Sequence, residues 1–224
     1  MDDLISEFKK YAHLDKGVKE CEFNRYSESI KDMTSIVVDE RKRSYREIDV
    51  FSRLIMDRII FLGTEVNSEV SNIIVAQLLF LESLDKEAPI SIYINSPGGE
   101  IYSGMSIYDT MQFISPQIVT VCTGLGASMA AVLLAGGAKG KRYALRHSKI
   151  MIHQPSGGTR GRASDMEVSL KQLIGVKKEL YEILAECTGK TVEQIEKDSA
   201  MDYWMTSQEA KEYGLIDDIF EKKK

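Results

Sequence analysis

Residues 124–137, GLGASMAAVLLAGG, combine a glycine-rich turn with a short apolar helix, and Ser128 stands where the two meet. The preceding residues 118–122, IVTVC, form a β-branched run that predicts a buried strand. Strand, tight turn, serine and helix are the parts of a nucleophile elbow, which presents a serine hydroxyl at a helix N-terminus. The match is partial, because Ala130 stands where the usual pattern has a second glycine. Serine also favours the N-cap of an ordinary core helix, so the pattern alone leaves both interpretations open.

Composition and charge limit the class of protein. The chain has 224 residues, enough for one domain with a sizeable core, and 43% of them are hydrophobic. A net charge of −5 argues against nucleic acid as the main partner. The odd number of cysteines suits a reducing compartment. The acidic N-terminus is unlike a signal peptide, and no long apolar run follows it. We therefore expect a cytoplasmic protein without a membrane partner.

Strand and helix patterns alternate from about residue 50 onward. This alternation predicts an α/β domain with a mostly parallel sheet flanked by helices. Two glycine-rich loops, at 97–99 and 124–126, each follow a predicted strand, so we expect them to lie side by side at the carboxyl edge of the sheet. The expected strands are 58–62, 90–94, 118–122, 141–145 and 149–152, and residues 215–220 are expected to form a terminal strand or a tail.

A long helix is predicted in the second half of the chain. Ser164 and Glu167 have the spacing of a capping box, and the helix that they open is expected to span about 164–187. This is about twice the usual length of a helix. We expect it to project from the domain and pack on another subunit, rather than lie along its own sheet. Other helix starts are expected at Asn67 or Ser68, at Thr191 and at Thr206.

A serine nucleophile needs a base, and the chain has three histidines. His153 follows an apolar strand and so lies, like Ser128, at a strand end. His147 falls in a charged turn and His13 in the polar N-terminal stretch, so both are poorer candidates. The base in turn needs a carboxylate on its other ring nitrogen. Sequence spacing cannot choose among Asp198, Asp202, Asp217 and Asp218.

An oxyanion requires two N–H donors. The N–H of Met129, directly after Ser128, is one natural donor, and an N–H of the Gly98–Gly99 pair is the other. The alternative is that residues 97–99 form a plain turn. No His, Cys, Asp or Glu residues have the spacing of a zinc site, so we expect no metal.

Several blocks together resemble the ClpP family of Clp-type serine peptidases. The resemblance runs from about Met33 to Phe220 and implies a ClpP/crotonase-like fold and a serine endopeptidase of unfolded proteins, the proteolytic subunit of an ATP-dependent Clp protease. By motif position it implies Ser128 as nucleophile, His153 as base, Asp202 as acid, and the N–H groups of Gly99 and Met129 as oxyanion donors. The blocks are DRIIFLG (57–63), YINSPGGEIYSGMSIYDTM (93–111), GASMAAVLLAGGAKGKR (126–142), IMIHQPSGG (150–158) and EAKEYGLID (209–217).

The same resemblance implies a domain organisation and partners. Residues 1–33 would be an N-terminal extension or propeptide, 34–49 an axial loop region, and 50–224 the peptidase domain with helix 164–187 as a handle between rings. Two stacked seven-membered rings would form a tetradecamer. A hexameric ATPase of the ClpX or ClpA/ClpC type would feed it and use the ATP, so that this subunit holds no cofactor. The docking clefts for the ATPase would include Tyr93, Phe113 and Phe220.

Two departures from the family and two rival functions remain at this point. The N-terminal extension, residues 1–33, is longer than is usual in the family. Ala200 and Met201 stand where most members carry an acidic–arginine pair at the ring interface, so ring coupling is expected to differ. One rival is a crotonase-type CoA enzyme, which shares the fold and its oxyanion loops but has no serine nucleophile. The other is a non-catalytic member of a mixed ring.

Overall fold

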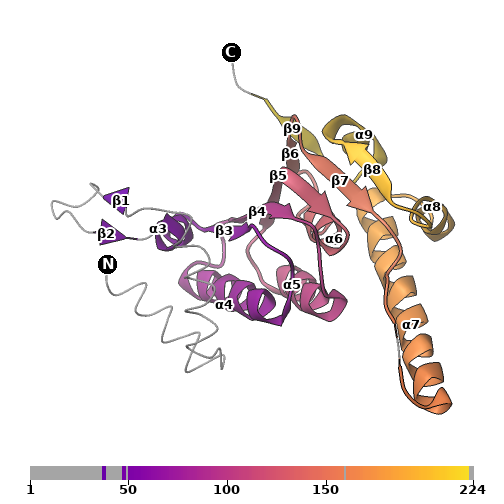
Figure 1. Cartoon of the computed structure of the whole chain (residues 1–224). Coiled ribbons are helices and arrows are strands. Elements are labelled where there is room, and N and C mark those ends of the chain that lie inside the picture. Colours follow the sequence, from indigo (N-terminus) through magenta and orange to yellow (C-terminus); the bar gives the residue numbers. More distant parts are fainter. Residues whose placement is uncertain (1–36, 39–46, 49, 159, 222–224) are drawn as a thin grey trace.

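The computed structural model describes residues 37–38, 47–48, 50–158 and 160–221, and its centre is a seven-stranded sheet (Figure 1). Along the order β3-β4-β5-β6-β9 every pair of neighbours is parallel. β7 pairs parallel with β5, and β8 pairs antiparallel with β7. The predicted α/β domain with a mostly parallel sheet is confirmed. The strands are β3 Ile59–Leu62, β4 Ile90–Ser96, β5 Ile118–Ala127, β6 Arg142–Leu145, β7 Lys149–Ile152, β8 Tyr203–Thr206 and β9 Asp218–Phe220.

Helices connect the strands, and α4 and α5 lie along one side of the β3–β4 part of the sheet (Figure 1). Asn67 caps α4, since its side chain accepts a hydrogen bond from the N–H of Val70 as the sequence predicts. The helices are α3 Val50–Met56, α4 Ser68–Leu84, α5 Ile101–Phe113, α6 Met129–Ala135, α7 Ala163–Thr188, α8 Val192–Asp198 and α9 Ser207–Tyr213.

The predicted N-terminal extension, 1–33, lies outside the described residues, as does most of the predicted axial loop region, 34–49. Within that region β1 (Val37–Val38) pairs antiparallel with β2 (Glu47–Ile48).

β5 is longer than the predicted strand and changes its neighbour halfway. Residues 120–122 pair with β6, whereas residues 125–127 pair with β7. The carboxyl end of β5, which leads into Ser128, therefore lies beside the carboxyl end of β7, which leads into His153. This fork brings together two segments that the sequence alone could place only at the same edge of the sheet.

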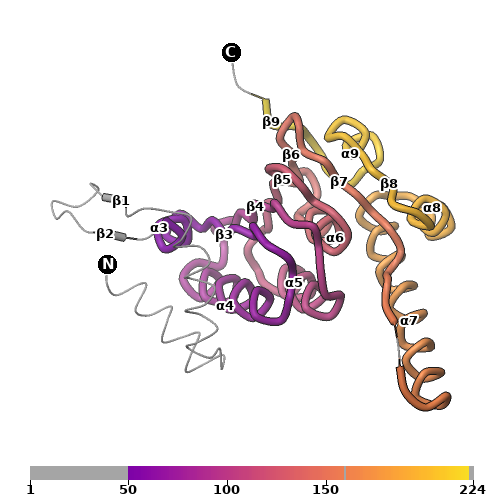
Figure 2. Tube along the Cα trace, in the orientation of Figure 1, coloured from indigo at the N-terminus to yellow at the C-terminus, as the bar shows by residue number. Residues whose placement is uncertain are grey.

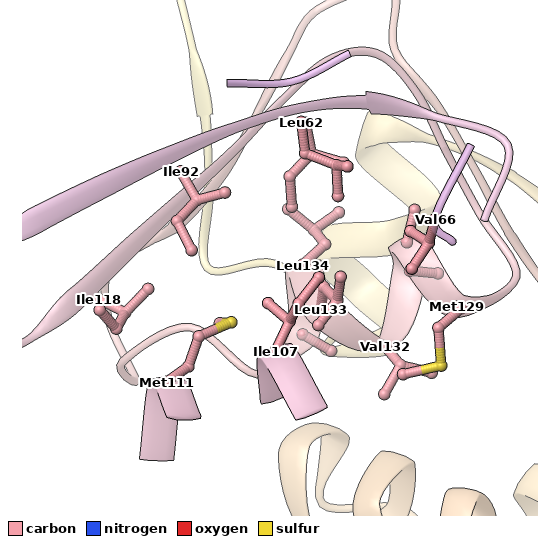
Figure 3. Packing of buried hydrophobic residues seen from close by; sticks show 14 of the residues in the cluster. Leu62, Val66, Ile92, Ile107, Met111, Ile118, Met129, Val132, Leu133 and Leu134 are labelled. Carbon is pink, nitrogen blue, oxygen red and sulfur yellow. The ribbon is translucent and has the colours of Figure 1, made fainter. Parts of the chain in front are cut away.

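The hydrophobic core surrounds α6, whose residues are all buried (Figure 3). Burying a large apolar side chain contributes about 1.5–3 kcal/mol, so this core holds α6 firmly in place. Gly104 of α5 is needed for the fit, because a Cβ there would lie 2.1 Å from Cγ of Met129. The first residue of α6 is thereby fixed from both sides, by the sheet and by α5.

α7 spans 26 residues, close to the predicted 164–187, and its N-terminal end extends beyond the other described elements (Figures 1 and 2). The predicted capping box of Ser164 and Glu167 is wrong, because the helix begins one residue earlier and has no side-chain cap. Gly161, with φ +150°, lets the chain turn at Arg162. Asp165 then occupies the third helical position, where its carboxylate accepts a 2.9 Å hydrogen bond from Nε of Arg162.

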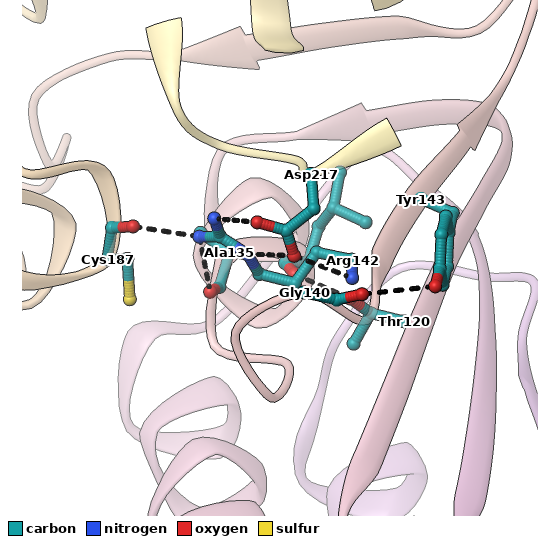
Figure 4. A network of polar contacts seen from close by, with 8 residues as sticks. Thr120, Ala135, Gly140, Arg142, Tyr143, Cys187 and Asp217 are labelled. Carbon is teal, nitrogen blue, oxygen red and sulfur yellow. Dashed lines mark hydrogen bonds and ion pairs between the residues drawn. The ribbon is translucent and has the colours of Figure 1, made fainter. Parts of the chain in front are cut away.

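A buried polar network ties β6 to the end of α7 and to the segment before β9 (Figure 4). Arg142 donates from Nη2 to Oδ1 of Asp217 at 2.7 Å and from Nη1 to the carbonyl oxygen of Cys187 at 2.8 Å. Burial alone would raise the pKa of Asp217, but the hydrogen bonds and charge of Arg142 outweigh it and hold that pKa below its ordinary value. The network is structural, and it removes Asp217 from the candidate catalytic acids.

Candidate active site

Ser128 occupies a strained turn between β5 and α6. Its φ of 55° and ψ of −125° lie in a region that non-glycine residues rarely adopt, at a cost of about 1–3 kcal/mol. Its N–H donates to the carbonyl oxygen of Met151 in β7 at 2.8 Å, which helps to hold the turn. The side chain makes no capping hydrogen bond, so the interpretation of Ser128 as a plain N-cap is wrong. The geometry is instead that of a nucleophile elbow.

The hydroxyl of Ser128 faces His153, which in turn faces Asp202. Nε2 of His153 lies 2.9 Å from Oγ of Ser128, and Nδ1 lies 3.0 Å from Oδ1 of Asp202. With the ring proton on Nδ1, the imidazole donates to the carboxylate and accepts from the hydroxyl, so it can take up the serine proton. The side chain of His153 is 27% exposed, whereas that of Asp202 is 58% exposed. The imidazole is therefore partly open to solvent.

The other candidate acids and bases that the structure describes lie elsewhere. Asp198 accepts a 2.8 Å hydrogen bond from the hydroxyl of Tyr213, and Asp218 pairs with Lys211 at 2.7 Å. Together with the Arg142 partner of Asp217, these contacts leave Asp202 as the one carboxylate of the four that pairs with a described histidine. His147 is exposed in the turn after β6, and His13 lies outside the described residues.

The glycine-rich loop after β4 lies against the start of α6. The predicted loop at 124–126 is wrong, because these residues continue β5, in which Gly126 pairs with Ser96. A Cβ on Gly98 would lie 2.7 Å from Cβ of Ser128 and 2.9 Å from the nitrogen of Met129. Only glycine fits there, also because its φ is +93°. The two N–H groups expected to act as oxyanion donors, those of Gly99 and Met129, therefore belong to adjacent segments.

The orientation of the Gly98–Gly99 peptide is set by Val66. The carbonyl oxygen of Gly98 accepts a 2.8 Å hydrogen bond from the N–H of Val66. Because the peptide is trans, the N–H of Gly99 points away from Val66. No residue in the described part of the chain accepts a hydrogen bond from that N–H. Sequence reasoning missed Val66, since it acts through its main chain and leaves no side-chain signal.

A cavity of about 60 Å³ adjoins the serine. Its wall includes Ser128 and His153, both oxyanion candidates, and apolar side chains of α6 and α7 such as Val132 and Leu184. A cavity with this lining suits an apolar side chain of a peptide whose neighbouring peptide bond lies at the Ser128 hydroxyl. The described residues contain no group of three or more His, Cys, Asp or Glu placed to hold a metal ion. No described helix combines the length and apolar character needed to cross a membrane.

Comparison with known proteins decides the family. A family model for Clp protease matches residues 41–223. The chain belongs to the Clp protease family. The resemblance inferred from the sequence motifs is thus confirmed, and this Clp protease has the proteolytic activity that the family is named for. The match favours the peptidase over the crotonase-type enzyme.

Relatives named "ATP-dependent Clp protease proteolytic subunit" match this Clp protease over nearly its whole length. The relative from Porphyromonas gingivalis is 53% identical over 97% of this chain and 99% of its own. A relative from Bacteroides fragilis is 50% identical over 98% of this chain and 100% of its own, and one from Bacteroides thetaiotaomicron has the same identity and coverage.

Proposed function

We propose that this protein is the proteolytic subunit of an ATP-dependent Clp protease and that Ser128, His153 and Asp202 form its catalytic triad. The observation that carries the proposal is the unbroken chain of contacts from Oγ of Ser128 through the imidazole to Oδ1 of Asp202, at 2.9 and 3.0 Å. Each distance lies within hydrogen-bond range, and the order of groups is the one that serine nucleophiles require.

The mechanism follows from the positions of these groups. An unfolded polypeptide binds with its scissile carbonyl at Ser128 and an adjacent side chain in the 60 Å³ cavity. His153 takes the proton of the hydroxyl as Oγ attacks the carbonyl carbon, while the N–H groups of Gly99 and Met129 stabilise the oxyanion. His153 then protonates the leaving amine, and water hydrolyses the acyl-enzyme in the same way. No cofactor takes part in these steps.

Assembly and partners belong to the same proposal. Two stacked heptameric rings enclose the sites, and α7 lies between the rings, in keeping with its exposed apolar residues Val168, Leu170 and Ile174. A cytoplasmic hexameric ATPase of the ClpX or ClpA/ClpC type unfolds the substrates and consumes the ATP. Its docking surface includes Tyr93, Phe113 and Phe220, of which Phe113 is 80% exposed.

A labelled fluorophosphonate tests the nucleophile, because such a reagent phosphonylates only an activated serine. The assembled wild-type particle is expected to react at Ser128, and Ser128→Ala is expected neither to react nor to cleave a short fluorogenic peptide. Ser156→Ala is the matched control, since Ser156 also lines the cavity but has no histidine partner among the described residues.

Two outcomes would contradict the proposal. Full peptidase activity in Ser128→Ala would refute the proposed triad. Cleavage only after a second, related subunit is added would support the non-catalytic ring member instead.

A further inference from the structure

The catalytic carboxylate is the least supported member of the proposed triad. Within the described part of the chain, the polar contact of the Asp202 side chain is the one to His153, and that side chain is 58% exposed. An exposed carboxylate with one partner can rotate into water at little cost. The position of Asp202 therefore depends on the main chain around it.

That main chain lies just beyond the end of a β-ladder. The antiparallel pairing of β7 and β8 ends at Ile152 and Tyr203. His153 and Asp202 are the next residues on the two strands, so the ladder stops one step before the catalytic pair. Strand ends without further pairing tend to separate, and separation here would draw the carboxylate away from the imidazole.

Gln154 joins the two strands again past this point. Its N–H donates to the carbonyl oxygen of Ser199 at 2.7 Å, and its side-chain Nε2 donates to the carbonyl oxygen of Ala200 at 3.0 Å. One residue thus holds two consecutive peptides of the segment that leads into Asp202. Ser199 is itself fully buried, so the segment is anchored on its far side as well.

We infer that the side chain of Gln154 is a positioning residue that keeps Asp202 on Nδ1 of His153. The inference rests on the proposed triad. Gln154 acts through Asp202 and has no described contact with Ser128. The side-chain amide is needed as a donor, because its partner is a carbonyl oxygen and only a donor can bind it.

The test compares kcat and KM for a short fluorogenic peptide, using assembled full-length particles isolated by size exclusion. Gln154→Met keeps the length of the side chain but removes its donor. We expect kcat to fall about three- to tenfold, the value of one net hydrogen bond, with KM unchanged. In an Asp202→Asn background, Gln154→Met should not lower kcat any further, since the carboxylate that Gln154 positions is already lost.

Gln112→Ala is the matched control. Gln112 also donates from its side-chain amide to a main-chain carbonyl oxygen, that of Gly136 at 2.8 Å, but at the far end of α6. We expect its kcat to remain at the wild-type value.

Each other outcome decides against the inference. Wild-type kcat in Gln154→Met, while kcat of Asp202→Asn is strongly reduced, would overturn the positioning role and leave the triad intact. A rise in KM at constant kcat would make Gln154 a substrate contact, and a full additional loss in the Asp202→Asn background would mean that it acts elsewhere. If no particle assembles with either Gln154→Met or Gln154→Ala, the residue is structural. Full activity of Asp202→Asn itself would instead refute the triad.

Discussion

The two ends of the proposed triad are held by different physical means. Ser128 stands on a strained turn, and the helix that follows it is wholly buried. Asp202 stands on an exposed segment and has a single described partner. Packing thus fixes the nucleophile, whereas a few exposed hydrogen bonds fix the acid. The comparison predicts that substitutions at the buried end disturb both stability and activity, and that those at the exposed end disturb activity alone.

Asp202→Asn should have the largest effect on activity. The amide can no longer stabilise the imidazolium and can bind the wrong tautomer, which in a Ser-His-Asp enzyme lowers kcat about 10⁴-fold. Because Asp202 is exposed, we expect the unfolding midpoint in urea to stay within the error of the wild type. A strongly lowered midpoint would break the contrast between the two ends.

Gly98→Ala should lower both the activity and the stability of the protein. Its Cβ would lie 2.6 Å from the carbonyl oxygen of Ala127, at a φ of +93°. The loop must move, and the loss of one of the two proposed oxyanion donors should lower kcat about 10²–10³-fold. The kcat for peptide hydrolysis and the urea concentration at the unfolding midpoint, measured on the same preparation, should both fall. Gly158→Ala is the control, since a Cβ there meets nothing within 4 Å. Equal effects of the two substitutions would contradict the steric argument.

Asp217→Asn should lower stability without changing the chemistry. Removing one partner of a buried ion pair costs about 3–5 kcal/mol. The lowered pKa of Asp217 stabilises the fold above the ordinary value of 3.8, and this stabilisation is lost as the pH falls through the folded-state pKa. Wild-type unfolding free energy should therefore decline in acid more steeply than that of Asp217→Asn. Parallel pH profiles would show that Arg142 does not hold the carboxylate in its charged form.

Asn67→Ala should have the smallest effect. It removes the N-cap of α4, worth about 1 kcal/mol, next to the residue that orients the Gly98–Gly99 peptide. The midpoint temperature of thermal unfolding should fall slightly. The kcat should remain unchanged, because Val66 acts through its main chain. A clear drop in kcat would mean that the oxyanion loop depends on the start of α4.

The sequence could predict the buried end of the site but not the exposed end. Residues 118–137 contain the strand-turn-helix pattern and the small residues around Ser128, so the sequence indicated an elbow or a plain N-cap, and the backbone angles of Ser128 favour the elbow. The choice of Asp202 over Asp198 came from family resemblance, because their partners, His153 and Tyr213, are brought to them only by the fold. The start of α7 was mispredicted because the chain turns at Gly161, which a capping-box pattern does not record.

Because β5 pairs first with β6 and then with β7, the turn between β6 and β7 constrains the distance between Ser128 and His153 in the proposed triad. That turn, residues 146–148, sets how far β7 advances along β5 before His153 is reached. One extra residue taken up by β7 would slide the imidazole by about 3.3 Å and rotate it to the opposite face of the sheet. Arg146 and His147 are exposed, so their side chains are open to substitution, whereas the length of the turn is not.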